Sequence, residues 1–176
     1  MTTLKITDGV LKDEILVLGL ASTNSKGGIT VESGDLSIDT KLILASLGDM
    51  GATGAADEVI KVPGSAVRMM VFTGLGKKSN TYSHEVLRRA AGAASRALAG
   101  NTAATFALPG GNLENLAAVA EGAVLGAYAF NEFRGSSKAD HKTALKTITV
   151  YSTLATKADA KAAIVRAKII ADYTFL

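Results

Sequence analysis

The order in which strand-like and helix-like segments follow one another most limits what this chain can fold into. From about residue 57 onward, short apolar runs alternate with longer segments in which apolar residues recur every three or four positions. The short runs predict strands at residues 58–62, 67–72, 105–108 and 145–151, and the longer segments predict helices at residues 87–98, 113–133 and 159–175. Parallel strands need such crossovers, usually helical ones. We therefore predict an α/β fold: a three-layer α/β/α sandwich with a mixed, mostly parallel sheet.

The first third of the chain is less regular. Residues 15–18 form an apolar run that predicts a buried strand, and residues 29–31 predict a short strand or one arm of a hairpin. The spacing of apolar residues from Leu36 to Leu47 favours a helix over a strand. The run at residues 58–62 ends at Pro63-Gly64 and predicts an edge strand, because proline cannot donate to a sheet ladder.

Two alanine-rich helices are the clearest predictions. Leu87, Ala90, Ala91, Ala94 and Leu98 define one apolar stripe, and Asn112 is placed to cap the helix that begins at Leu113. That second helix contains Gly122 and Gly126, four residues apart and so on one face. Each glycine costs a helix about 1 kcal/mol relative to alanine. The pair therefore predicts the close approach of another backbone, which we expect to be that of the sheet.

Composition excludes several kinds of active site. The chain has no Cys, so disulfides, thiolate nucleophiles and Cys-containing metal sites are excluded. Its two histidines, His84 and His141, lie far apart among polar neighbours and predict surface residues. The adjacent acids Asp13-Glu14 and Asp57-Glu58 would point to opposite faces of a strand. No membrane span or secretion signal is evident, so the cytoplasm is the expected compartment.

Two glycine-rich segments are the only ligand-like features. The segment from Thr73 to Lys77 predicts a tight turn after a strand. The Gly74–Lys77 backbone could hold a phosphate in that turn. An ordinary strand-to-helix turn is the more common explanation of such a pattern. Pro109 to Asn112 allows the same two interpretations. Residues 134–168 carry eight Lys or Arg against two Asp, a net charge of +6. A solvated face explains that charge better than nucleic-acid binding, because aromatic residues are sparse.

Several segments together resemble the N-terminal domain of the leucyl aminopeptidases, also called cytosol aminopeptidases. One is Val71-Phe72-Thr73-Gly74-Leu75-Gly76-Lys77, and another is the helix from Glu121-Gly122 through Leu125-Gly126 to Phe133-Arg134. Arg88-Arg89-Ala90-Ala91-Gly92 and Arg96-Ala97-Leu98 resemble the family's helix after the Gly-Leu-Gly turn. The order and spacing fit over roughly residues 10–176.

The resemblance implies a macro-domain-like fold over residues 1–153, followed by a connector helix over residues 154–176. The apolar end of the chain agrees with a continuation into a C-terminal catalytic domain. In the family, that domain binds two divalent metals (Mn²⁺ or Zn²⁺) and hydrolyses peptides from their N-terminus, preferring Leu, within a hexamer. The resemblance therefore implies an assembly or regulatory domain with no catalytic, cofactor-binding or metal-binding residues of its own. Two alternatives remain: a free-standing macro-like module that binds ADP-ribose or a related nucleotide, and a DNA-binding role for residues 134–168.

Overall fold

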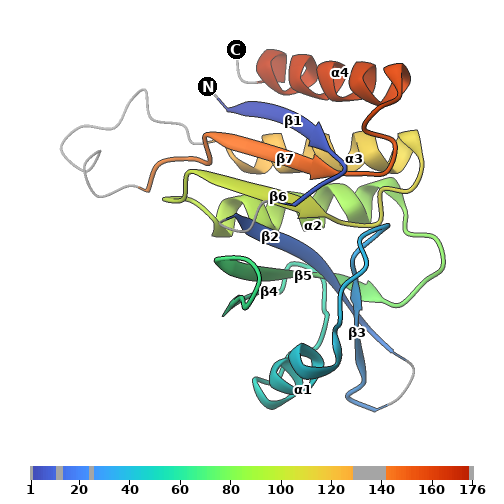
Figure 1. Cartoon of the computed structure of the whole chain (residues 1–176), viewed down its shortest axis with the longest axis vertical. Helices are drawn as coiled ribbons and strands as arrows, with labels where there is room; N and C mark the ends of the chain where they lie inside the picture. The colour runs from blue at the N-terminus through green and yellow to red at the C-terminus, as the bar shows by residue number, and fades with distance from the viewer. Residues whose placement is uncertain (1, 11–13, 24–25, 129–141, 175–176) are drawn as a thin grey trace.

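The computed structural model describes residues 2–10, 14–23, 26–128 and 142–174. Its strands are β1 (Thr3–Thr7), β2 (Ile15–Ser22), β3 (Ile29–Glu32), β4 (Val59–Pro63), β5 (Met69–Lys77), β6 (Ala103–Ala107) and β7 (Thr147–Tyr151). Its helices are α1 (Lys41–Asp49), α2 (His84–Ala97), α3 (Leu113–Gly126) and α4 (Ala158–Thr174). Figure 1 shows their arrangement. Within the described ranges, no helix is long and apolar enough to cross a membrane.

The strands form one sheet in the order β1-β7-β6-β2-β5-β4, with β3 paired to β2 at one end. The pairs β1–β7, β6–β7, β2–β6 and β2–β5 are parallel. The pairs β2–β3 and β4–β5 are antiparallel, so residues 29–32 form one arm of a hairpin and β4 is an edge strand. The predicted α/β fold with a mixed, mostly parallel sheet is confirmed.

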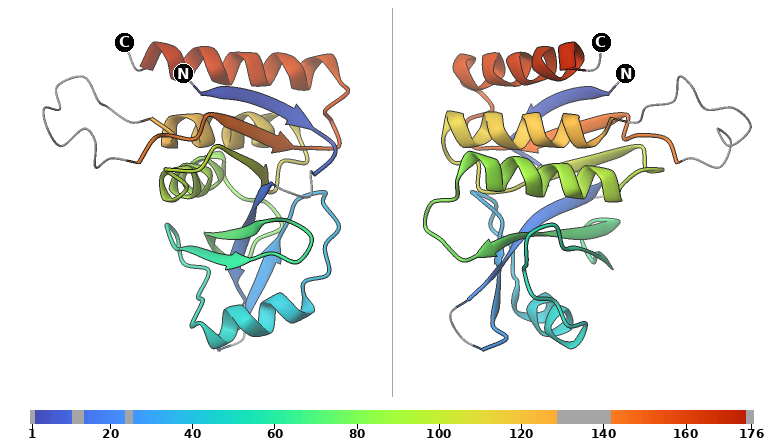
Figure 2. Two further views of the ribbon diagram at one scale, coloured as in Figure 1. Left: turned by 60° about the vertical axis from the view of Figure 1, so that its left-hand side comes forward. Right: turned by 180° about the vertical axis from the view of Figure 1, so that it is seen from behind.

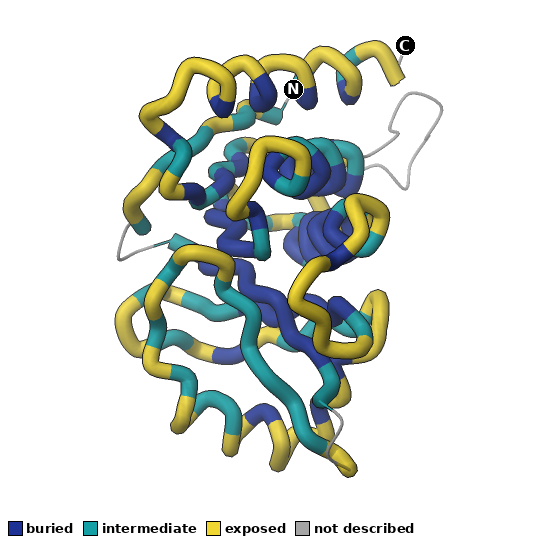
Figure 3. Tube along the Cα trace, turned by 90° about the vertical axis from the view of Figure 1, so that its right-hand side faces the viewer, coloured by how far each residue is buried: buried dark blue, intermediate teal, exposed yellow. Residues whose placement is uncertain are grey.

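Alternating residues of the central strand β2 separate two apolar cores. Ile15 and Val17 belong to the core shared with α2, α3 and α4. Leu16 and Leu18 belong to a smaller core on the other face, to which α1 contributes Leu47. Figure 2 shows α2 and α3 lying along one face of the sheet, with α1 apart from them. Burial along the trace follows this division, being deepest in β2 and on the inner sides of α2 and α3 (Figure 3).

Two helix boundaries differ from the prediction. Residues 36–40 are not helical, and α1 begins at Lys41, whose N–H donates to Asp39 Oδ1 at 3.2 Å. Leu36 instead closes a turn, in which its N–H donates to the Ser33 carbonyl at 3.1 Å. Leu36 and Ile38 still pack on the smaller core, which explains the apolar spacing that suggested a helix. Helix α3 ends at Gly126, whereas the predicted end at residue 133 lies outside the described residues.

Candidate functional site

The segment Gly74–Lys77 is a strand, so the tight turn predicted there is wrong. Strand β5 continues to Lys77, and α2 begins only at His84, after Ser83 caps it by accepting from the Val86 N–H. The Gly74 N–H donates to the Glu58 carbonyl and the Gly76 N–H donates to the Gly54 carbonyl, each at 2.8 Å. Both groups are therefore occupied, and this backbone does not form the phosphate cradle that the glycine spacing suggested.

The second glycine-rich segment lies beside a polar crevice. Asn112 caps α3, as predicted, because its side-chain oxygen accepts from the Asn115 N–H at 2.8 Å. A cavity of about 330 Å³ adjoins this cap, and its lining includes two carboxylates, those of Glu32 and Asp35, but no Lys, Arg or His. Two carboxylates in the lining, with the Lys78 charge near only one of them, disfavour a phosphate. Pro109–Asn112 is thus a helix start beside an acidic crevice, and the second phosphate hypothesis is not supported by its surroundings.

Burial affects the titration of two residues in that crevice. Burial raises the pKa of the Glu32 carboxyl, and the nearby Lys78 partly opposes the rise. Burial also raises the pKa of Tyr82; the hydrogen bond with Ser79 opposes this rise, and the charge of Glu32 adds to it. The Ser79 N–H donates to the Tyr82 hydroxyl at 3.4 Å. These contacts fix the loop that leads into α2.

The described members of the histidine and acidic pairs contact other parts of the fold, as Glu14 does by accepting from Thr105, and Asp13 lies outside the described ranges. His84 faces Glu114 at 3.6 Å with both side chains exposed, and His141 lies outside the described ranges. Asp57 pairs with Arg89, whereas the Glu58 carboxylate accepts from the N–H groups of Thr53 and Gly54. Among the described residues, no group of three or more His, Cys, Asp or Glu is placed to hold a metal ion.

The two glycines of α3 do mark a close approach, but the partner is helix α2 and not the sheet. A Cβ added at Gly122 would lie 2.1 Å from the Arg88 carbonyl oxygen, and one added at Gly126 would lie 2.3 Å from the Gly92 carbonyl oxygen. Real Cβ atoms do not approach backbone oxygen so closely. The sequence identified the contact correctly and the contacting element wrongly, because spacing within one helix does not reveal which neighbour it meets.

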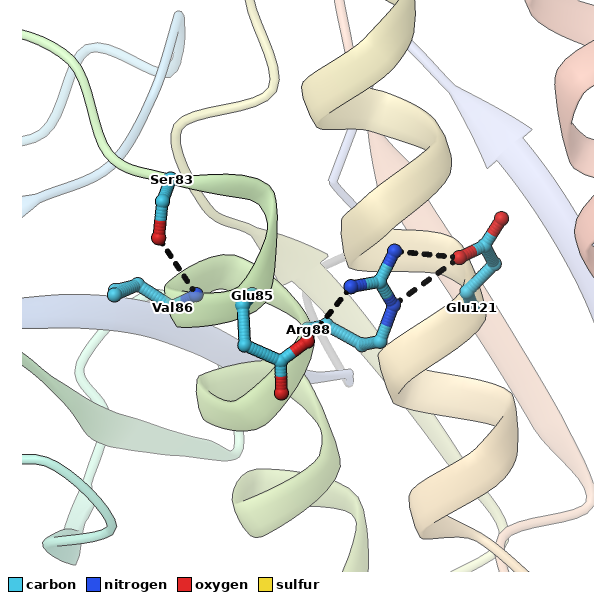
Figure 4. Close-up of polar contacts among 5 residues, drawn as sticks. All are labelled: Ser83, Glu85, Val86, Arg88 and Glu121. Atoms are coloured by element: carbon cyan, nitrogen blue, oxygen red, sulfur yellow. Dashed lines mark hydrogen bonds and ion pairs between the residues drawn. The ribbon is translucent and has the colours of Figure 1, made fainter.

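A charged cluster spans the same helix pair (Figure 4). The Arg88 guanidinium donates to Glu121 Oε2 through Nε at 3.2 Å and through Nη2 at 3.0 Å, and it donates to Glu85 at 2.8 Å. Burial lowers the pKa of Arg88, but its hydrogen bonds and attraction to Glu121 and Glu85 raise the pKa by more. The net pKa is therefore higher than usual. Sequence analysis singled out Arg88 only as part of a family resemblance, because its partner lies 33 residues away.

We expect Glu121→Gln to lower the free energy of unfolding by about 1 kcal/mol, since it weakens a partly buried charged hydrogen bond. Glu121 is the right target because its side chain is only 18% exposed. Glu85→Gln is the matched control, because Glu85 contacts the same arginine with a side chain 66% exposed. Urea unfolding of both variants measures the difference, and equal losses would contradict the importance of the interhelical pair.

Helix α4 has exposed apolar residues on its outer side as well as a buried inner side. Ala160, Ala163, Ala167 and Ala171 are buried against the domain. Outward-facing apolar residues are exposed: Val165 to 59%, Ile169 to 49%, Ile170 to 41% and Tyr173 to 72%. We call these four residues the α4 outer face. Lys161 and Arg166 are exposed on the same helix, so its outer side is mixed, with Val165, Ile169 and Tyr173 recurring every four residues.

Comparison with known proteins places the chain among aminopeptidase N-terminal domains. The sequence model of the "Cytosol aminopeptidase family, N-terminal domain" matches residues 31–137. A probable cytosol aminopeptidase of Streptomyces griseus is 46% identical over 134 residues, which cover 71% of this chain and 26% of the relative. A probable cytosol aminopeptidase of Micrococcus luteus is 43% identical over 136 residues, which cover 73% of this chain and 26% of that relative. The chain spans about a quarter of the length of these relatives.

Solved structures share the fold. The bottromycin maturation enzyme BotP superposes with a TM-score of 0.64 at 21% identity, covering 92% of this chain and 31% of BotP. A variant of tomato leucine aminopeptidase superposes with a TM-score of 0.61 at 20% identity. The superposition covers 100% of this chain and 37% of the tomato enzyme's chain. At such identities the likeness concerns the fold alone.

Proposed function

The chain belongs to the cytosol aminopeptidase family as its N-terminal domain, and from this premise we propose that it is the non-catalytic, assembly or regulatory domain of a metal-dependent leucyl aminopeptidase. One observation carries the proposal: residues 31–137 of this chain match the model of the family's N-terminal domain. The chain also covers only about a quarter of the length of its relatives. The remaining part of such a protein then holds the catalytic machinery.

The proposed parent enzyme removes N-terminal amino acids, preferably Leu, from peptides, and acts as a hexamer in the cytoplasm. Two divalent metals, Mn²⁺ or Zn²⁺, would activate water in the C-terminal domain. The described residues of this chain do not fit such a metal pair. Two of their acidic side chains pair with arginines instead, Asp57 with Arg89 and Glu121 with Arg88. We propose that this chain contributes no catalytic, cofactor-binding or metal-binding residue to the parent enzyme.

We expect the 176-residue chain to show no hydrolysis of leucine amide, even with added Mn²⁺ or Zn²⁺. The reason is the donor set just described: the described residues offer no group of three metal-binding side chains. The measurement is release of ammonia at equal molar concentrations of this chain and of a full-length family member. Turnover that depends on the metal and follows the chain through purification would contradict the proposal.

We further propose that residues 154–176 connect the domain of residues 1–153 to the catalytic domain, with the α4 outer face packed against the latter. Support comes from the exposure of Val165, Ile169, Ile170 and Tyr173 on a helix whose other side is already buried. Burial of apolar surface contributes roughly 25 cal/mol per Å² removed from water, so such a face gains stability when covered.

Ile169→Asp should distinguish a covered face from a solvated one. In the 176-residue chain we expect a change in unfolding free energy within about 0.5 kcal/mol, since the residue is half exposed. In a full-length family member carrying this domain, the same change should lower Tm by several degrees, because it buries a charge at an interface. Lys161→Asp, at another exposed position of α4, is the control. Equal effects of Ile169→Asp in both lengths would contradict the interface.

The alternative of a free-standing ADP-ribose module receives no support from the family match, the curated relatives or the solved structures. The geometry agrees with that finding, because the Gly74 and Gly76 N–H groups are occupied by backbone carbonyls. The hypothesis of DNA binding by residues 134–168 concerns a segment whose first eight residues lie outside the described ranges. In its described part, Lys157 and Lys161 are exposed and Lys168 pairs with Asp172.

A further inference from the structure

An apolar cavity of about 670 Å³ lies on the α1 side of the sheet, away from α2, α3 and α4. Its floor includes Leu16 of β2 and Met70 of β5, and one wall is α1, seen near the bottom of Figure 1. The other walls come from residues 36–39 and from residues 63–67, which join β4 to β5. We call this cavity the α1 groove. Its volume is within the range of about 300–1,000 Å³ that is typical of small-molecule sites.

The lining of the α1 groove is mainly aliphatic. It includes Val10, Leu16, Leu36, Ile38, Leu42, Ile43, Val67 and Met70. Several of these side chains are only half buried, and Leu42, on α1, is 86% exposed. When an apolar molecule fills a solvent-exposed apolar cavity of this size, apolar surface is removed from water and the complex is stabilised.

One charged group, a carboxylate, lies at the α1 groove and gives it a local negative charge. Among the described residues that line it, Asp39 is the only charged one; the polar remainder of that described lining consists of Ser37, Ser46 and Ser65. Asp39 Oδ1 accepts from the Lys41 N–H at 3.2 Å, and no hydrogen bond or ion pair to Oδ2 is found among the described residues. A single carboxylate at the edge of an aliphatic cavity attracts a cation and repels an anion.

We infer that the α1 groove binds a small apolar molecule that carries one positive charge. The apolar part occupies the space between α1 and the sheet, and the ammonium group pairs with Asp39. The N-terminal end of an apolar peptide has this chemistry, and choosing a peptide among such amines rests on the proposed function of the parent enzyme. The groove is then a contact site for peptides on this domain.

Titration of the 176-residue chain with three probes tests the inference, with binding read from the NMR shifts of backbone amides in α1. Leucyl-leucinamide has two apolar side chains and a free amino group. N-acetyl-leucyl-leucinamide keeps the side chains without the charge, and decanoate is an apolar anion. We expect saturable binding of the free amine, binding about two- to fivefold weaker for the acetylated form, as suits an exposed ion pair, and binding of decanoate weaker than that of the free amine.

Two pairs of variants place the ligand. Asp39→Asn should remove the preference for the free amine, whereas Asp49→Asn, at an exposed residue of the same helix outside the groove, should preserve it. Leu42→Ala should weaken both dipeptides severalfold, whereas Met50→Ala, next to the same helix and 57% exposed, should not. All four positions are exposed, so these changes leave the fold intact.

Other outcomes overturn the inference. Decanoate binding as tight as that of the amine would show that charge does not select the ligand. Binding unchanged by Leu42→Ala and Asp39→Asn would place the ligand elsewhere. Self-association in sedimentation experiments that Leu42→Ala abolishes, without peptide binding, would identify a second copy of the chain as the occupant. Because the readout is binding and not turnover, a failure here is distinct from a failure of the proposed enzyme function.

Discussion

Replacing Gly126 by leucine is expected to lower the free energy of unfolding by about 3 kcal/mol or more. A Cβ at this position would lie 2.3 Å from the Gly92 carbonyl oxygen and 2.5 Å from the Gly92 Cα. Neither atom can move without separating α2 from α3, and overpacking of this kind typically costs about 1–3 kcal/mol, occasionally more. For a chain of this size the melting temperature should fall by about 2–4 °C per kcal/mol.

Gly48→Leu is the matched control for that experiment. Gly48 also lies in a helix, α1, but a Cβ added there meets nothing within 4 Å. Removing a glycine from an open helical position should leave stability unchanged or raise it by up to about 1 kcal/mol. Thermal unfolding of both variants therefore separates steric contact from helix propensity. A Gly126→Leu protein as stable as the wild type would show that α2 and α3 do not pack at this distance.

Gly74→Ala is the second change expected to have a large effect, about 3 kcal/mol or more. A Cβ here would lie 1.7 Å from the Ala55 carbonyl oxygen, because the loop before β4 crosses β5 at this residue. That loop is also held by Glu58, whose carboxylate accepts from the Gly54 N–H at 2.6 Å. The loop must shift to admit the methyl group, and the hydrogen bond from the Gly74 N–H to the Glu58 carbonyl is then lost.

Gly76→Ala provides the contrast within the same strand. Gly76 has φ of +79°, but a Cβ there meets no atom within 4 Å. Its cost should be the roughly 1–2 kcal/mol of placing a side chain in the left-handed region. Denaturant unfolding of the two variants compares a steric clash with backbone strain. If Gly74→Ala were the milder change, the close crossing of the loop over β5 would be disproved.

The parts of the fold that sequence predicts well are those set by local periodicity. The apolar stripe that includes Leu87, Ala90 and Ala94 predicts α2, and all three residues are buried. Asn112 is also a local signal, since a cap and the N–H that it satisfies are three residues apart. Alternation of strands and helices then limits the sheet to a mostly parallel one, which is what the structure shows.

The errors arise where distant residues decide the outcome. Thr73–Lys77 has the glycine spacing of a turn, yet its backbone pairs with β2 on one side and receives residues 54–58 on the other. Likewise Gly122 and Gly126 signal a neighbour without identifying it. The α1 groove was not anticipated, because its walls come from separate segments of the chain whose apolar residues each resemble ordinary core positions.

The pairing of β1 with β7 has a consequence for biosynthesis. Thr3 lies opposite Thr147 and Thr7 lies opposite Tyr151, so β1 has no described partner strand until β7, about 140 residues later in the chain, has been synthesised. Joining segments so far apart costs loop-closure entropy and delays folding. Until β7 is present, β1 and one edge of β6 lack their partner strand. Unpaired strand edges of this kind are prone to aggregation. Completion of this sheet therefore waits until β7 has been synthesised.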